Sequence, residues 1–89
     1  MTVKIQKENF NVAKEIEKLT SKISNYGSLV SFLGNVRKVS NGNNIISLNI
    51  EHYPGMTEKQ LQKIQKTAVK KWKLEECLII HRYGELLPK

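Results

Sequence analysis

Arginine is rare in this chain, which otherwise carries its positive charge on lysine. Of the 15 basic residues only Arg37 and Arg82 are arginine. Arg37 ends the run Gly34-Asn35-Val36-Arg37, where an apolar stretch gives way to a polar loop. A planar guanidinium binds a phosphate or carboxylate with two parallel hydrogen bonds, which a lysine ammonium cannot copy. Arg37 is therefore a candidate anion ligand; the alternative interpretation is a surface arginine paired with a glutamate.

The other side chains capable of chemistry form weaker patterns. Cys77 is the single cysteine and lies in an apolar run, which is typical of a small core residue rather than a nucleophile. His52 and His81 are far apart in the sequence and no second cysteine accompanies them, so neither a metal nor a cofactor is expected. Both histidines are interpreted as structural residues. All acidic residues are glutamate, which excludes calcium loops built on aspartate.

Composition indicates one domain over residues 1–89. A hydrophobic content of 39% and a mean hydropathy of -0.43 are typical of a soluble globular protein. The first ten residues lack the apolar stretch of a signal peptide, and no run is long enough to span a membrane, so we expect a cytoplasmic protein. The net charge of +7 has two interpretations: solvated lysine-rich surfaces, or attraction to an anionic partner.

A first helix is predicted after Asn11, which suits an N-cap, and Gly27 suits a left-handed C-terminal cap. Its apolar stripe is Val12, Ile16, Leu19 and Ile23. A second helix is predicted after the turn Pro54-Gly55, with Thr57 and Gln60 forming a capping box. Its predicted core stripe is Leu61, Ile64, Ala68 and Trp72. Its opposite face carries Lys59, Lys63, Lys66 and Lys70.

Strands are predicted at Val3–Ile5, Ser28–Val36, Ile46–Glu51 and Cys77–Ile80 from their apolar alternation or short apolar runs. Asn41-Gly42 is a strong turn signal, and we expect a hairpin that pairs the second and third strands. The order β-α-β-β-α-β predicts an α+β fold with a mixed or antiparallel sheet and two helices.

This order is also that of a common RNA-binding fold, which stacks bases on strand aromatics. The third predicted strand has no aromatic residue before Tyr53. Lysines spaced along one helix face are typical of a solvated surface. Nucleic-acid binding is therefore the weaker alternative.

Three segments carry a family resemblance: GSLVSFLGNVR (27–37), LNIEHYPGMTEKQL (48–61) and IIHRYGELLP (79–88). In order, spacing and content they resemble the large, catalytic subunit of molybdopterin synthase. Trp72 also matches a feature of that family. The resemblance covers nearly all of the chain from Gly27 onward and is loose over residues 1–26.

The resemblance implies the α/β hammerhead fold and a homodimer of large subunits. Each large subunit would bind a small ubiquitin-like sulfur carrier, forming a heterotetramer. The carrier ends in a Gly-Gly thiocarboxylate. Its sulfur passes to cyclic pyranopterin monophosphate, which makes the enzyme a sulfurtransferase of molybdenum cofactor biosynthesis. Both the substrate phosphate and the carrier terminus are anionic. The positive net charge of the chain is therefore explained without nucleic acid or a membrane.

Residues are carried over from the family only where its motif matches. The strand-end motif of the substrate pocket matches Asn35, Val36 and Arg37, and Phe32 matches an apolar wall of that region. The motif His-Arg-x-Gly falls on His81, Arg82 and Gly84, which we interpret as structural.

The resemblance extends only to the N-terminal portion of the family, whose catalytic lysines lie in the part that follows. No position here matches those lysines, and Lys89 aligns with none of them. We therefore assign no catalytic residue and expect these 89 residues alone to be inactive and to self-associate through exposed apolar surface. Three explanations stay open: a truncated chain, a shortened gene, or a second polypeptide that supplies the rest. The alternative function is a non-catalytic binding module that keeps a dimer or carrier-binding surface.

Overall fold

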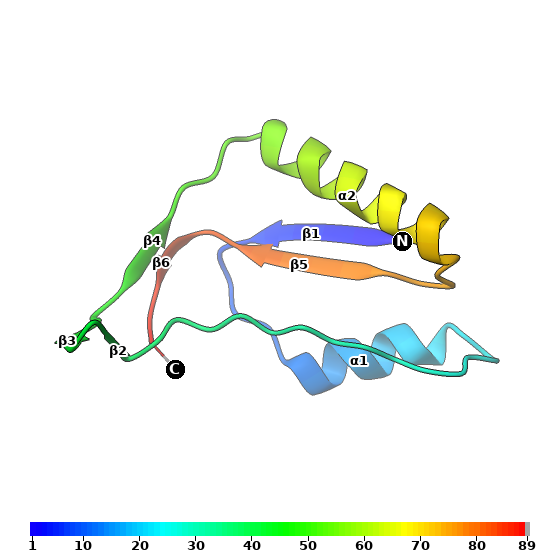
Figure 1. Cartoon of the computed structure of the whole chain (residues 1–89), viewed down its shortest axis with the longest axis horizontal. Coiled ribbons are helices and arrows are strands. Elements are labelled where there is room, and N and C mark those ends of the chain that lie inside the picture. Colours follow the sequence, from blue (N-terminus) through cyan, green and yellow to red (C-terminus); the bar gives the residue numbers. More distant parts are fainter. Residues whose placement is uncertain (89) are drawn as a thin grey trace.

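The structure, a computed structural model, describes residues 1–88 and has an α+β architecture (Figure 1). The elements are β1 (Thr2–Gln6), α1 (Val12–Ser21), β2 (Val39–Ser40), β3 (Asn43–Asn44), β4 (Leu48–Ile50), α2 (Met56–Trp72), β5 (Leu78–Arg82) and β6 (Gly84–Leu86). Both predicted helices are present, and α1 ends several residues earlier than predicted.

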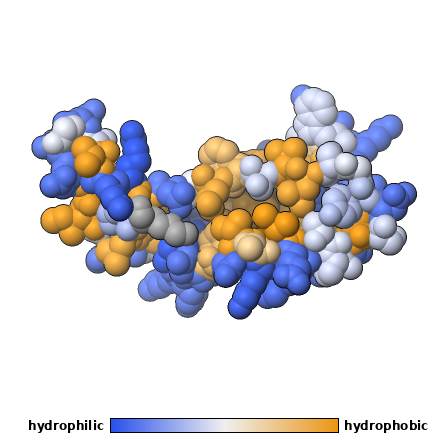
Figure 2. All heavy atoms as spheres, turned by 90° about the horizontal axis from the view of Figure 1, so that it is seen from below, coloured by the Kyte–Doolittle hydropathy of each residue, from blue (hydrophilic) through white to orange (hydrophobic). Residues whose placement is uncertain are grey.

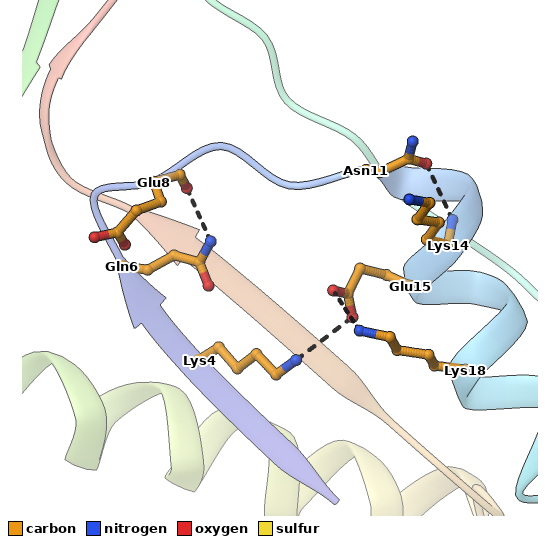
Figure 3. Close-up of polar contacts among 7 residues, drawn as sticks. All are labelled: Lys4, Gln6, Glu8, Asn11, Lys14, Glu15 and Lys18. Carbon is orange, nitrogen blue, oxygen red and sulfur yellow. Dashed lines mark hydrogen bonds and ion pairs between the residues drawn. The ribbon is translucent and has the colours of Figure 1, made fainter.

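The central layer is a parallel pair of strands from opposite ends of the chain. β1 and β5 run from Thr2 beside Leu78 to Gln6 beside Arg82. α2 packs along β1, and Figure 1 shows the strand pair lying between α2 and α1. An ion pair of 3.5 Å between Lys4 Nζ and Glu15 Oε2 joins β1 to α1 (Figure 3).

Two smaller antiparallel pairs complete the sheet structure. β2 and β3 form a short hairpin around Asn41 and Gly42, whose φ angles of 52° and 79° confirm the predicted turn. β4 does not pair with residues 28–36 as predicted. It pairs instead with β6, which the sequence pattern did not reveal, with Leu48 beside Leu86.

Ser28–Val36, predicted as a strand, lies in no strand. The segment is extended in Figure 1 and links α1 to β2 without joining a sheet of the described residues. Val30 and Phe32 are 93% and 96% exposed. β-branched and aromatic residues form a strand only where a neighbouring edge and a packed face receive them. β6 pairs with the edge of β4 at which we expected Ser28–Val36 to pair.

The local caps explain where the helices begin and end. Asn11 is the N-cap of α1 as predicted, because its side-chain oxygen accepts the Lys14 amide at 3.1 Å. α1 ends at Ser21, so the cap predicted at Gly27, whose φ is not positive, is wrong. At α2 the capping contact runs from the Gly55 amide to Glu58 Oε2 at 2.7 Å, in place of the predicted box.

The buried core of the described residues is small. Leu86 is the one hydrophobic residue classed as buried, and Gln65 the one buried polar residue. Trp72 and Ile64 are 67% and 60% exposed, so half of the core stripe predicted on α2 faces solvent. Figure 2 shows apolar side chains gathered around a recess on one face of the molecule. Much apolar surface is therefore available for contacts beyond residues 1–88.

Candidate functional site

The candidate anion ligand Arg37 follows the extended segment Ser28–Val36 and precedes β2. Its side chain is exposed, and within residues 1–88 no ion pair involves it. The alternative interpretation, a surface arginine held by a glutamate, therefore has no support in the described part of the chain. The guanidinium keeps its planar face and its donors available to an external anion.

The other three predicted substrate residues lie beside Arg37 along the chain. Asn35 is exposed, Val36 is half-buried and Phe32 is almost fully exposed. A groove between the start of α1 and the extended segment is lined by Leu33 and by none of the four. Their convergence on one pocket is thus not visible in residues 1–88, and their role stays a prediction.

Gly34 does not mark the bulge that a glycine in a strand suggests. Its φ is not positive, and a Cβ atom built on it would meet only the ring of Phe32, at 4.0 Å. On the side where a Cβ atom would lie, the backbone at Gly34 is therefore not covered by other residues of 1–88.

A second cluster of polar residues joins the end of β4 to the turn between β5 and β6. The ring of His52 stacks on Tyr83, with centroids 4.3 Å apart. His52 Nε2 lies 3.9 Å from Glu58 Oε1, and Nδ1 is buried without a partner within the described residues. The ammonium of Lys7 lies 5.6 Å from the Tyr83 ring centroid. His52 thus lies at the junction of β4, α2 and the turn between β5 and β6, and its structural role stays a prediction.

Arg82 differs from Arg37 because two of its side-chain nitrogens already donate to the backbone. Nε and one terminal nitrogen donate to the carbonyl oxygen of Lys7 at 3.0 and 2.8 Å. This fork fixes the chain leaving β1 against the end of β5. These contacts support the structural interpretation of Arg82, and within residues 1–88 Arg37 has no comparable contact.

Gln65 is a structural residue that sequence reasoning missed. Its side-chain amide donates to the carbonyl oxygens of Thr2 and Cys77 at 2.9 and 2.8 Å. These bonds join α2 to the first residue of β1 and to the residue before β5. The signal was available: Leu61, Gln65 and Val69 repeat every four residues, so glutamine stands at the centre of the inward face.

Cys77 lies just before β5 and is half-buried. Its carbonyl oxygen accepts the Thr2 amide at 3.2 Å as well as the Gln65 side chain. Within residues 1–88 no three His, Cys or Glu side chains are grouped as a metal ion would need. Nor does any described helix have the length and apolarity to cross a membrane.

These observations describe a small basic α+β protein in which Arg82 is bonded to the backbone and Arg37 is exposed and can bind an anionic ligand. Comparison with known proteins identifies the family. The model of the MoaE protein family matches residues 5–89, and the chain belongs to that family.

Two relatives show how far the similarity extends. The "Molybdopterin synthase catalytic subunit" of Vibrio cholerae is 46% identical over 85 residues, which are 96% of this chain and 56% of the relative. The protein of the same name from Ralstonia nicotianae is 39% identical over 88 residues, which are 99% of this chain and 50% of the relative. The chain thus spans about half the length of these curated relatives.

A solved structure confirms the fold. The "Molybdopterin biosynthesis MoaE protein" of Burkholderia ambifaria superimposes with a TM-score of 0.86 at 38% identity. The match covers 98% of this chain and 56% of that one. The α+β architecture and the family resemblance inferred from the sequence are both confirmed.

Proposed function

We propose that this chain serves as a molybdopterin synthase catalytic subunit in molybdenum cofactor biosynthesis. The reaction moves sulfur from the C-terminal thiocarboxylate of a small carrier subunit to cyclic pyranopterin monophosphate. Two relatives of this chain carry the name of that enzyme. The partners proposed with it are the carrier, a second large subunit and the pterin substrate, in a cytoplasmic heterotetramer.

The observation that carries the proposal is the contrast between the two arginines. Arg82 donates to a backbone carbonyl, whereas Arg37 has no ion pair within residues 1–88. A substrate phosphate needs a cation with paired donors, and Arg37 is the arginine that can supply them. Asn35 and the open backbone near Gly34 supply further donors to the same anion. Phe32 offers an exposed ring to the flat pterin.

The mechanism assigned to residues 1–88 is therefore binding and orientation of substrate. Fixed positive charge at Arg37 also stabilises negative charge that develops during the transfer of sulfur. None of the lysines in this sequence matches a catalytic position of the family resemblance. For these 89 residues tested alone we expect substrate binding without turnover.

Calorimetric titration with cyclic pyranopterin monophosphate tests the assignment. Arg37→Ala should weaken binding about 10- to 100-fold, the loss expected for one charge-assisted contact. Lys38→Ala is the matched control, because it removes an adjacent exposed positive charge without the guanidinium fork. Equal losses in the two variants, or no loss with Arg37→Ala, would remove Arg37 from the site.

A second titration uses the thiocarboxylated carrier. Binding of carrier together with product formation would show that these residues suffice for catalysis, against our expectation. Failure to bind both carrier and pterin would contradict the proposed function.

A further inference from the structure

One flank of α2 carries an apolar groove beside a row of lysines. The groove has a volume of about 370 Å³. Ile64, Ala68 and Trp72 repeat every four residues along it, and Lys63 and Lys71 lie on its rim. It belongs to neither the candidate substrate segment nor the surface of α2 that packs on β1.

The groove exposes residue types that bind partners. Trp72 is 67% exposed and Ile64 is 60% exposed, although burying either side chain would lower the free energy of the molecule. Tryptophan is the residue type most enriched at the energetic centre of interfaces. The ammonium of Lys71 lies 5.1 Å from the Trp72 ring centroid, so a group that covers the indole also meets a positive charge.

The two charged residues that line the groove are both lysines, Lys63 and Lys71. Lys59, Lys66 and Lys70 extend the positive charge onto the opposite face of α2. Within residues 1–88 none of them forms an ion pair, and the single acidic residue of α2, Glu58, lies in its first turn. A second copy of this chain would bring the same positive surface and be repelled.

We propose that this flank of α2 is a docking site for an acidic protein surface with a protruding apolar side chain. The apolar side chain would lie against Ile64 and Trp72, while carboxylates would face the lysines on the rim. A nucleic acid would satisfy the lysines but would leave Ile64 and Ala68 without an apolar partner, so protein is favoured. The inference does not depend on the proposed enzymatic function.

The experiment uses the fluorescence of Trp72, the single tryptophan, as a reporter inside the groove. The probe is a synthetic amphipathic helical peptide with a leucine face and a glutamate face. We expect saturable binding with a blue shift of the Trp72 emission, weakened by added salt. Polyglutamate and a single-stranded oligodeoxythymidine are comparison probes, because they offer charge without a leucine face.

Two variants and a control separate the groove from general electrostatics. Ile64→Ser and Lys63→Glu should each weaken peptide binding at least about ten-fold, a loss of roughly 1.4 kcal/mol. Both side chains lie on the surface, and far-UV circular dichroism checks that the helix is kept. Lys14→Glu on the exposed side of α1 makes the same change in net charge and should leave binding within about two-fold.

Four results would overturn the proposal. The first is an unchanged Trp72 emission at peptide concentrations that saturate binding. The second is equal weakening by Lys14→Glu and Lys63→Glu. The third is an equal emission shift with polyglutamate or the oligonucleotide, which would make the site a charge-only surface. The fourth is a blue shift on raising the protein concentration alone, which would assign the groove to a second copy.

Discussion

β5 and the segment Ser28–Val36 have similar composition and different fates. Both are rich in β-branched or large apolar residues. β5 has a parallel neighbour in β1 and a helix nearby, and its residues are half-buried. Ser28–Val36 has no strand partner within residues 1–88, and two of its side chains are more than 90% exposed. Propensity alone therefore does not make a strand; an available edge and a covered face do.

The largest effect on stability is expected from removing the best-buried side chain of the paired strands. Leu86 in β6 is 7% exposed. Leu86→Ala should lower the free energy of unfolding by about 2 to 3 kcal/mol, measured by urea titration with far-UV circular dichroism. Leu87→Ala is the matched control, since Leu87 is 66% exposed, and should change it by less than about 0.5 kcal/mol. Equal effects would show that the described burial does not stabilise the chain.

The next test removes the polar contact that joins α2 to the strand pair. Gln65→Leu keeps the size of the side chain but leaves the carbonyls of Thr2 and Cys77 without this donor. We expect a loss of about 2 kcal/mol in the free energy of unfolding. Gln62→Leu, at an exposed position of the same helix, should be close to neutral. A neutral Gln65→Leu would mean that water replaces the amide.

A substitution in the exposed segment Ser28–Val36 should leave the free energy of unfolding almost unchanged. Phe32→Ser should change the free energy of unfolding by less than about 0.5 kcal/mol, because Phe32 is 96% exposed. It should, however, reduce the self-association that we expect from the exposed apolar surface. Sedimentation velocity over a range of concentrations measures this. A monodisperse wild-type monomer that melts cooperatively would contradict the expectation.

The smallest expected effect concerns pH at the start of the paired layer. The Cys77 amide, at 3.0 Å, and the N-terminal ammonium, at 3.3 Å, lower the pKa of Glu76 below its ordinary value of 4.5. A lowered folded-state pKa contributes stability above the unfolded pKa, which is lost as pH falls through the folded value.

Urea midpoints at about pH 6 and about pH 3 measure that contribution. Glu76→Gln should reduce the difference between the two midpoints, and the exposed neighbour Glu75→Gln should leave it unchanged. An identical difference in wild type and Glu76→Gln would show that the contact with the amide does not stabilise the fold.

Local features were predictable from the sequence. The periodicity of α1 and α2, the Asn11 cap and the Asn41-Gly42 turn depend on residues close along the chain. The motifs also sufficed to identify the family. What failed was non-local: β6 was not predicted, and Ser28–Val36 was expected to pair with β4, whose partner is β6.

The candidate site was predictable only in part. The position of Arg37 at the end of an apolar run was readable, and the structure shows its side chain exposed. The engagement of Arg82 was not readable, because its acceptor, Lys7, is 75 residues away. Gln65 was missed because a hydropathy pattern treats glutamine as a surface residue. Long-range hydrogen bonds decide both cases. The spacing of Leu61, Gln65 and Val69 indicated that Gln65 faces inward, but the sequence did not show the acceptors of either side chain.

The pairing of β1 with β5 also sets the order of events as the chain is made. β1 leaves the ribosome well before β5, its partner in the strand pair. Until β5 emerges, the edge of β1 and the apolar side of α1 have no sheet to join, and closing so long a loop is entropically slow. The nascent chain therefore lacks its central layer until β5 has been made, and we expect chaperones that bind apolar segments to hold it during that interval.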